Sequence, residues 1–269
     1  MGRVVFEGAW QQFFGKFGLK SFDDFFMFSG GRIINKNHKR DVRVLTLGEN
    51  GDGKVFFMKR FYNVHFKDIF FTFHNLGRFC SQGRYEWENA KLLLSNGIET
   101  YKPVCCSEQN RFGFEQKSFF ITEQIQGRCF TDFIAENWAR LAQTQKENLI
   151  VSLGKTIRKI HASHINFPDL YAWHIFIKKA ENNKNGDNWE FAFIDLHRMT
   201  RNVTNKNQLL QNLGRLDHSM LDKYFDESIR RVLIESYAGQ NWPGGIDRLA
   251  RKVKRFSDAV SAKRNPKQY

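Results

Sequence analysis

The sequence predicts an α+β fold with two lobes, a strand-rich lobe over residues 1–125 and a helical lobe over residues 126–269. Three observations lead to this prediction. The chain has 269 residues, of which 41% are hydrophobic, and this is enough for one large core or two smaller ones. Patterns typical of strands gather in the first half. Patterns typical of helices dominate the second half, after a break at Gly127.

Four stretches justify the strand-rich lobe. Residues 43–47 and 55–59 have the composition of strands and flank a glycine-rich turn at 48–53, which predicts a β-hairpin. Residues 82–96 carry apolar side chains on one face and end at an Asn-Gly pair, which predicts a helix. Residues 117–123 form a further predicted strand.

The helical lobe contains a periodic apolar stripe, with spacings of four, four and three residues, that predicts one core-facing helix. This stripe consists of Leu149, Leu153, Ile157 and Ile160. Apolar runs at 174–177 and 191–194 flank a polar turn at 180–188, and they predict two short strands. The stretch 208–256 contains few turn signals and is predicted to be helical.

The chain is strongly basic, because 42 Lys and Arg residues outnumber 28 Asp and Glu residues and give a formal net charge of +14. This charge predicts an anionic partner such as phosphate, nucleic acid, an anionic membrane or an acidic protein. The apolar runs are too short for a membrane-spanning helix, and polar residues interrupt any secretory segment near the start. The cysteines form no CxxC pair and are expected to be reduced thiols of a cytoplasmic protein. They are Cys80, Cys105, Cys106 and Cys129.

The residues that indicate chemistry begin in the helical lobe. Asp169 follows Pro168 in a loop, His174 comes five residues later, and Asp195 ends the predicted strand at 191–194. Kinases use this order of residues. A loop Asp accepts the proton of the substrate hydroxyl, the residue five positions on helps to hold metal, and the Asp after the strand binds magnesium. We expect Asp169 to lie in an open loop with few packing partners.

A kinase also needs a strand lysine that holds the ATP phosphates and a helix glutamate that pairs with this lysine. Lys59 ends the strand at 55–59. Glu86 and Glu88 both lie on the following helix, and we prefer Glu86 because it lies about three turns before the glycine that closes the helix. The chain has no GxGxxG loop. The candidate replacements are Ser29-Gly30-Gly31 and the turn at 35–39.

Together these residues resemble the lipopolysaccharide core kinases of Gram-negative bacteria, the Kdo/WaaP type. The resemblance covers roughly residues 40–240. It is most specific in Asp-Leu-Tyr-x-x-His at 169–174 and in Ile-Asp-Leu-His-Arg at 194–198, because ordinary protein kinases have neither. Where the heptose kinases of the family carry His-Arg before the loop Asp, this chain has Phe167-Pro168. Further matching segments are 57–59, 85–87, 97–100, 118–123 and 161–174.

The resemblance implies a bilobal protein-kinase-like fold, ATP as the phosphate donor and Mg²⁺ as the metal. The implied acceptor is a heptose or Kdo hydroxyl of the lipid A–core glycolipid. The implied location is cytoplasmic and peripheral, on the inner face of the inner membrane. The resemblance assigns Lys59, Glu86 and Glu123 to nucleotide binding, Asp169 to catalysis, Asp195 to nucleotide and metal, and His174 to phosphate, metal or metal-bound water.

Two stretches bear on how a membrane-bound acceptor is reached. Residues 61–79 are rich in Phe and contain one acid, which fits a buried helix and a membrane contact equally well. An apolar stripe at 249–260 predicts a basic amphipathic helix, which either packs on the protein or binds an anionic membrane surface with Leu249 and Phe256 inserted. We predict no nucleic-acid partner, because no motif that contacts bases is present. The cations around the stripe are Arg248, Arg251, Lys252, Lys254 and Arg255.

Two other functions stay open at this point. The same fold could phosphorylate a soluble small molecule such as an amino sugar. A chain with Phe167-Pro168 before its loop Asp could also be a pseudokinase that binds without catalysis. Arg198 is either a phosphate contact or part of a surface salt bridge. An acidic carrier protein is left open as a partner that stabilises this basic chain.

Overall fold

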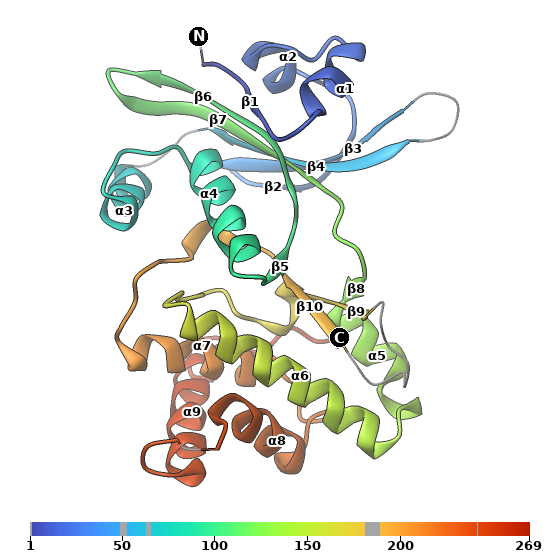
Figure 1. Cartoon of the computed structure of the whole chain (residues 1–269), viewed down its shortest axis with the longest axis vertical. Coiled ribbons are helices and arrows are strands. Elements are labelled where there is room, and N and C mark those ends of the chain that lie inside the picture. Colours follow the sequence, from blue (N-terminus) through green and yellow to red (C-terminus); the bar gives the residue numbers. More distant parts are fainter. Residues whose placement is uncertain (1, 49–52, 63–65, 181–188, 241) are drawn as a thin grey trace. The chain divides into compact units, whose positions relative to one another are not determined.

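The computed structural model describes residues 2–48, 53–62, 66–180, 189–240 and 242–269, with their side chains apart from those of Phe66 and Ile69. These residues form two compact units (Figure 1). The first unit comprises Met1–Leu92 and Tyr101–Ile125, and the second comprises Leu93–Thr100 and Gln126–Tyr269. The central residues of the predicted turns, 49–52 and 181–188, lie outside the described residues.

Within the described residues, the first unit contains one antiparallel sheet of six strands in the order β1-β6-β7-β4-β3-β2. The predicted hairpin is confirmed, since β3 pairs with β4 and Val42 lies opposite Lys59. Both strands extend beyond their predicted ends. The strands are β1 (Val5–Phe6), β2 (Arg32–Lys36), β3 (Arg40–Leu47), β4 (Lys54–Tyr62), β6 (Pro103–Arg111) and β7 (Phe114–Glu123).

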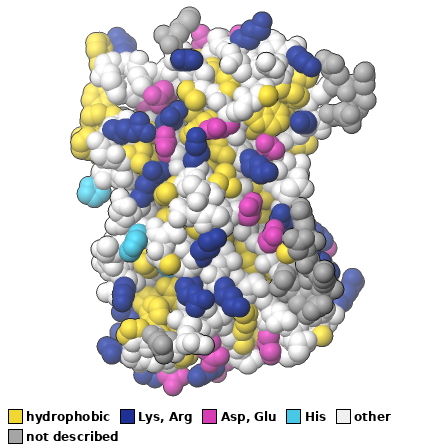
Figure 2. Space-filling model, viewed as in Figure 1, with side chains coloured by type: hydrophobic (Ala, Val, Ile, Leu, Met, Phe, Trp, Pro, Cys, Tyr) yellow, Lys and Arg dark blue, Asp and Glu magenta, His cyan; other side chains and the backbone are white. Residues whose placement is uncertain are grey.

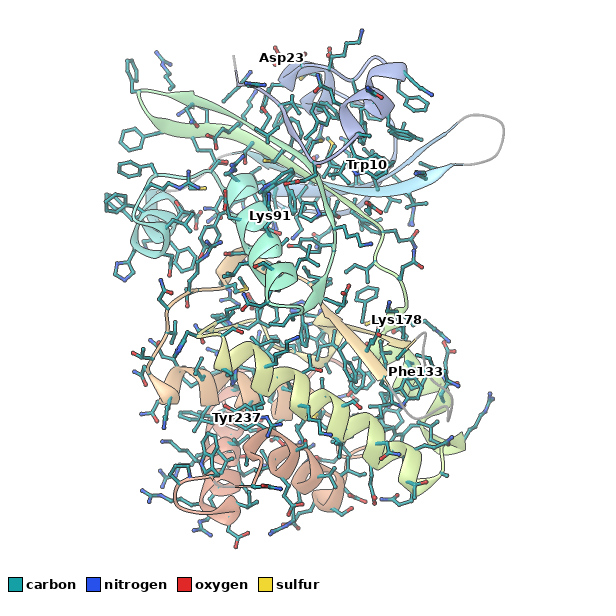
Figure 3. The ribbon with its side chains drawn as sticks, in the orientation of Figure 1. Trp10, Asp23, Lys91, Phe133, Lys178 and Tyr237 are labelled. Carbon is teal, nitrogen blue, oxygen red and sulfur yellow. The ribbon has the colours of Figure 1, made fainter. Side chains whose placement is uncertain are left out.

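The core of the first unit explains many of the 28 phenylalanines of the chain. Two short helices cover one face of the sheet (Figure 1). The fully buried rings of Phe14 and Phe56 lie there with their centroids 5.1 Å apart. Trp10 lies on the first of these helices (Figure 3). Its ring packs edge-on against Phe56 at 5.2 Å, a favourable geometry for aromatic pairs. The two helices are α1 (Trp10–Lys16) and α2 (Phe22–Phe26).

The strand β4 alternates between this core and the opposite face of the sheet. Phe56 is fully buried in the core with α1 and α2, so Lys59, an odd number of residues away, points to the other face. Lys59 lies opposite Phe120 of β7, and Phe120 packs against Trp87 of α4 (Gln82–Ser95). The predicted helix is therefore present, and the strand period turns Lys59 toward it.

The second unit is mainly helical and, in the described part of the chain, has one four-stranded sheet in the order β5-β10-β9-β8. The predicted stripe is confirmed in α6, where all four of its residues are buried. The predicted helical stretch divides into α7, α8 and α9. The strands are β5 (Glu99–Thr100), β8 (Arg128–Cys129), β9 (Ile175–Lys179) and β10 (Trp189–Phe193). The helices are α5 (Phe130–Asn137), α6 (Gln143–Ala162), α7 (Lys206–Ser219), α8 (Glu227–Ala238) and α9 (Ile246–Ser261), with 3₁₀ turns η1 (Trp138–Arg140), η2 (Ala172–His174) and η3 (Leu196–Arg198).

The apolar stripe of α9 packs inside the second unit. Leu249 and Val253 are each 2% exposed. A Cβ atom at Gly214 of α7 would lie 2.4 Å from Cβ of Phe256, so only glycine allows the two helices to approach this closely. The prediction that Leu249 inserts into a membrane is therefore wrong, because its side chain is buried in the protein, whereas Phe256 is half-buried beside Gly214. The exposed cations of the helix are Arg248, Arg251, Lys254 and Arg255.

Helix α3 (Phe66–Leu76) presents aromatic side chains to solvent. Phe70 is 61% exposed. The ring of Phe73 stacks on Phe79 at 4.8 Å, and Phe79 lies edge-on to Phe114 at 5.8 Å. Figure 2 shows apolar side chains gathered along this edge of the first unit. A fully buried helix is thus excluded, whereas a membrane contact stays a prediction.

The described helices include none with the length and apolar composition that a bilayer crossing requires. All four cysteines are unpaired, as predicted. Burial raises the pKa of Cys80 and of Cys106 to about 12. These two thiols are therefore protonated at neutral pH, which fits packing roles.

Candidate active site

Lys59 and Glu86 form an ion pair inside the first unit. Nζ of Lys59 lies 2.7 Å from Oε2 of Glu86, and Glu86 is completely buried. Tyr101 donates its hydroxyl to the same carboxylate oxygen at 2.9 Å. Glu88, the other candidate from the sequence, accepts a hydrogen bond from Arg84 at 3.1 Å instead. The structure therefore places Glu86, and not Glu88, beside Lys59.

This ion pair holds a lysine at a fixed position. A buried carboxylate needs compensation, because loss of water around an ionised oxygen is costly. Lys59 and Tyr101 compensate Oε2, whereas Oε1 of Glu86 has no hydrogen-bond partner among the described residues. The side chain of Lys59 stays 18% exposed. The pair can thus present an ammonium group to an anion while Glu86 fixes it from behind.

The two candidate phosphate loops lie at the two ends of β2. The turn at 35–39 joins β2 to β3, and Oδ1 of Asn37 accepts the main-chain N–H groups of Lys39 and Arg40 at 2.8 and 3.0 Å. Gly31 precedes β2 with a φ of +88°, and a Cβ atom there would lie 2.5 Å from a carbonyl oxygen of β3. The close approach of β3 and the positive φ therefore explain why position 31 is a glycine. The segment at 29–31 and the turn at 35–39 both stay predictions for a phosphate loop.

Glu123 is the last residue of β7. Its main-chain N–H group donates to the carbonyl oxygen of Lys102 at 3.0 Å. Its half-buried carboxylate has no hydrogen bond or ion pair with the residues that the structure describes. The nucleotide role of Glu123 stays a prediction.

Asp169 lies in the second unit and is only 3% exposed. Arg198 donates to both of its carboxylate oxygens, with Nε 2.7 Å from Oδ2 and a second hydrogen bond from NH2 to Oδ1. These hydrogen bonds raise the pKa of Arg198. The expectation of an open carboxylate with few partners is therefore wrong. The Pro168 loop folds back against η3, and Arg198 comes from the motif that ends β10.

The loop that carries Asp169 is fixed from α7. Oδ1 of Asn212 accepts the main-chain N–H group of Phe167 at 2.8 Å and lies 3.2 Å from Nε2 of His161. Ser219 accepts the main-chain N–H group of Ala172 at 2.8 Å. Both ends of the segment around Asp169 are thus held by buried side chains of one helix.

His161 is part of this buried hydrogen-bond network, and its lowered pKa makes the folding stability depend on pH. Its Nδ1 lies 2.9 Å from the hydroxyl of Tyr237, and burial lowers the pKa of His161 to about 4. Between about pH 4 and 6.5 the unfolded chain binds more protons at this histidine than the folded protein does. Stability from the neutral ring is therefore complete at neutral pH and falls, by about 3 kcal/mol, as the pH drops through this window.

We expect His161→Gln to show a smaller fall in the free energy of unfolding than the wild type between pH 7 and pH 4.5. Urea unfolding at the two pH values measures this difference. The control is His164→Asn, because His164 is exposed and its φ of 56° suits Asn. Equal pH dependence of wild type and His161→Gln would contradict the assignment.

Asp195 directly follows Ile194, whose main-chain N–H group donates to the carbonyl oxygen of His174 at 3.0 Å. Asp195 has a φ of 66°, which is uncommon for a residue other than glycine and frequent at functional sites. Nδ1 of His197 lies 2.7 Å from Oδ1 of Asp195. The strand end, the strained backbone and the histidine together fix the direction of this carboxylate.

His174 faces the same carboxylate with an available lone pair. Its Nδ1 lies 2.9 Å from the main-chain oxygen of Asp169, which can only accept, so Nδ1 carries the proton. Burial lowers the pKa of His174, so the ring is neutral at neutral pH. Nε2 lies 3.8 Å from Oδ2 of Asp195, too far for a hydrogen bond. A carboxylate and a neutral imidazole fit a divalent cation, and since Mg²⁺ prefers oxygen, His174 suits a metal-bound water better than the metal.

The model of the lipopolysaccharide kinase (Kdo/WaaP) family matches residues 29–237. The chain belongs to this family. The lipopolysaccharide core heptose(I) kinase WaaP of Escherichia coli strain K12 is 26% identical over 155 residues, which cover 57% of this chain and 58% of the relative. A second WaaP, from Escherichia coli, is 26% identical over 148 residues, which cover 54% and 56%. The chain thus spans between half and two thirds of the length of these curated relatives.

A solved structure of WaaP in complex with acyl carrier protein matches with a TM-score of 0.71 at 19% identity, over 97% of each chain. At this identity the likeness shows the fold. It confirms the predicted α+β, protein-kinase-like fold. Every predicted site residue of this Kdo/WaaP family member lies within 29–237, whereas α9 begins after that range.

Several residues that support the site in this protein were not identified from the sequence. Tyr101, which supports Glu86, lies outside any motif, and Asn212 and Ser219 are 14 residues or more beyond the last motif at 194–198. One signal was available. Polar residues at spacings of three and four interrupt the apolar stripe of α7, and such residues indicate a face that contacts polar groups.

Proposed function

We propose that this chain transfers the γ-phosphoryl group of ATP to a sugar hydroxyl, heptose or Kdo, of the lipopolysaccharide inner core. Membership in a lipopolysaccharide kinase family supports this proposal. The single observation that carries it is the buried ion pair between Lys59 and Glu86, the pair that kinases use to hold ATP phosphates. The WaaP relatives are named as heptose(I) kinases, which favours heptose as the acceptor.

The proposed nucleotide contacts come from named side chains. Lys59 binds the α- and β-phosphates, and Glu86 keeps its ammonium group in place. Glu123 contributes to the nucleotide site from the end of β7. Asp195 and His174 hold Mg²⁺, the first directly and the second through metal-bound water. When bound, Mg²⁺ neutralises charge on the transferring phosphate.

Asp169 is the proposed catalytic residue, and its environment supports this role. Arg198 fixes the carboxylate through one lone pair on each oxygen. Each oxygen of an ionised carboxylate has a second lone pair, so Asp169 can still accept the proton of a sugar hydroxyl. The contact with Arg198 therefore orients the base without blocking it, which argues against a pseudokinase.

The test of this function is transfer of labelled phosphate from ATP to purified, dephosphorylated lipopolysaccharide core. We expect transfer that requires Mg²⁺ and a sugar hydroxyl. Transfer to soluble amino sugars alone would favour the first alternative, a small-molecule kinase. Nucleotide binding without transfer to any sugar would favour the second alternative, a pseudokinase.

We further propose that the chain works in the cytoplasm, peripherally on the anionic inner face of the inner membrane. The acceptor glycolipid keeps its acyl chains in the bilayer, so the protein has to approach the headgroup layer. The exposed cations of α9 and the aromatic edge at Phe70, Phe73 and Phe79 are the proposed contacts. An acidic carrier protein is a second proposed partner, supported by the net charge of +14 and by the WaaP complex with acyl carrier protein.

The cations of α9 predict salt-dependent binding to anionic vesicles. Arg248, Arg251 and Arg255 are exposed and have no ion-pair partner among the described residues. Each cation near an anionic surface contributes about 1 kcal/mol. We expect replacement of all three by Gln to weaken sedimentation with anionic vesicles by about 10²-fold at low salt. The effect should shrink at high salt, where charges are screened.

A matched control removes the same charge elsewhere on the second unit. Arg140, Lys155 and Arg158 are exposed cations of η1 and α6. Their triple replacement by Gln should leave vesicle binding close to the wild type. Equal losses in the two triple variants would mean that net charge, and not α9, governs binding. Activity on a soluble core fragment should persist in both variants.

A further inference from the structure

Helix α7 directs one more side chain at the loop of Asp169. Asn212 and Ser219 of this helix both bind the loop, at Phe167 and Ala172. Arg215 lies three residues after Asn212 and four before Ser219, so all three occupy one face of the helix. Arg215 is therefore carried toward the segment that contains Asp169.

The charges at this position do not balance. Arg198 already binds both oxygens of Asp169. Arg215 makes no hydrogen bond and no ion pair within the described part of the chain, and it is partly buried. Burial lowers the pKa of Arg215, the nearby charge of Arg198 lowers it further, and Asp169 opposes this effect. Arg198 alone thus binds the carboxylate of Asp169, and the charge of Arg215 has no bound partner among the described residues.

An unpaired and partly buried guanidinium is unfavourable for the folded protein alone. A planar guanidinium binds carboxylates and phosphates through two parallel hydrogen bonds. The side chain of Arg198 is 54% exposed, so part of it is accessible beside Arg215. The surplus positive charge next to the catalytic carboxylate therefore fits an anion that arrives with the substrate.

We infer that Arg215, together with the exposed part of Arg198, binds a carboxylate or phosphate group of the acceptor next to the hydroxyl that Asp169 activates. The inference rests on the proposed function and narrows it, because it requires an acceptor that carries an anionic group next to the heptose or Kdo hydroxyl that is phosphorylated. Kdo is a sugar acid, so the inner core offers carboxylates as well as phosphates. Arg215 is then a specificity-determining residue.

The test compares wild type, Arg215→Gln and Arg215→Lys on soluble inner-core oligosaccharides in three forms. One form keeps its carboxylates and lacks phosphates, one has phosphates and reduced carboxyl groups, and one lacks both. We expect Arg215→Gln to raise the KM for the anionic acceptor about 10- to 10²-fold, with the KM for ATP unchanged. Arg215→Lys should raise this KM less than Arg215→Gln does, because lysine keeps the positive charge. The control is Arg158→Gln, an exposed arginine of α6.

With the acceptor that lacks both groups, wild type and Arg215→Gln should have the same KM for the acceptor. If the KM values still differ on the form that keeps only carboxylates, Arg215 binds a carboxylate. If they differ on the form that keeps only phosphates, it binds a phosphate. An equal loss on all three forms, or a raised KM for ATP, overturns the inference and assigns Arg215 to folding or to the donor. Circular dichroism of both variants checks that they fold.

A binding measurement separates this inference from the proposed function. Calorimetric titration of the same oligosaccharides into the protein with ADP needs no turnover. If the wild type transfers no phosphate yet binds the anionic forms through Arg215, the kinase proposal fails and the anion site stands. If the wild type transfers phosphate but Arg215→Gln binds every form as the wild type does, the kinase proposal stands and the anion site fails. Absence of binding to any form overturns the anion site as well.

Discussion

Asp169→Asn is expected to lower the rate of phosphate transfer by about 10²–10⁴-fold, the usual effect of removing a general base. The amide keeps the shape of the carboxylate but cannot accept the proton of a sugar hydroxyl at neutral pH. Nucleotide affinity should stay close to the wild type, because the proposed ATP contacts are Lys59, Glu86, Glu123 and Asp195. Transfer rates and equilibrium binding of ATP, measured on the same preparation, check both statements.

The buried position of Asp169 adds a stability effect that requires its own control. Loss of the charged partner of Arg198 should cost about 1–2 kcal/mol, since Arg198 is half-exposed and can regain water. Asp217→Asn disturbs a similar pair, because Asp217 binds Arg230 at 2.6 Å in the same unit. This control should lose stability but keep its turnover. Near-normal turnover of Asp169→Asn would rule out the catalytic assignment.

The residues that the sequence could predict are those whose position follows from local pattern. The side-chain period of β4 turns Lys59 away from the aromatic core, and helical spacing brings Glu86 to it. The loop with Asp169 and the strand end with Asp195 lie next to strong patterns, a core helix and two short strands. For Lys59 and Glu86 a period of two or 3.6 residues decides where the side chain points, whereas for Asp169 and Asp195 the neighbouring patterns give only their place in the chain.

The remaining features depend on contacts between segments that are distant in the sequence. The burial of Asp169 requires Arg198, 29 residues later, to fold back over it. The support from Asn212 requires α7 to dock beside the loop, and no periodicity shows which helix does so. The stripe of α9 illustrates the same point, because amphipathicity indicates that a face is covered without showing by what. In the structure α7 covers this face, and Gly214 allows the close contact with Phe256.

The second large effect is expected at Lys59, where stability and nucleotide binding can be separated by a double variant. Lys59→Met removes the ammonium that compensates a fully buried carboxylate, and this should cost about 3–5 kcal/mol of folding stability. It should also reduce phosphate transfer by about 10²–10³-fold, because a fixed charge next to the phosphates is lost. Either loss alone would be ambiguous, since a partly unfolded kinase is also inactive.

The double variant Lys59→Met, Glu86→Gln resolves this ambiguity. The introduced glutamine side chain carries no charge and can still accept the hydroxyl of Tyr101 through its amide oxygen, so urea unfolding should show that much of the lost stability returns. Transfer and ATP affinity should stay low, because the double variant has no cation at this position. Lys91→Met is the matched control, since Lys91 and Glu7 form an exposed pair at 2.7 Å in the same unit and their loss should change neither property appreciably. If activity returned together with stability in the double variant, Lys59 would be a structural partner of Glu86 and not a ligand of ATP.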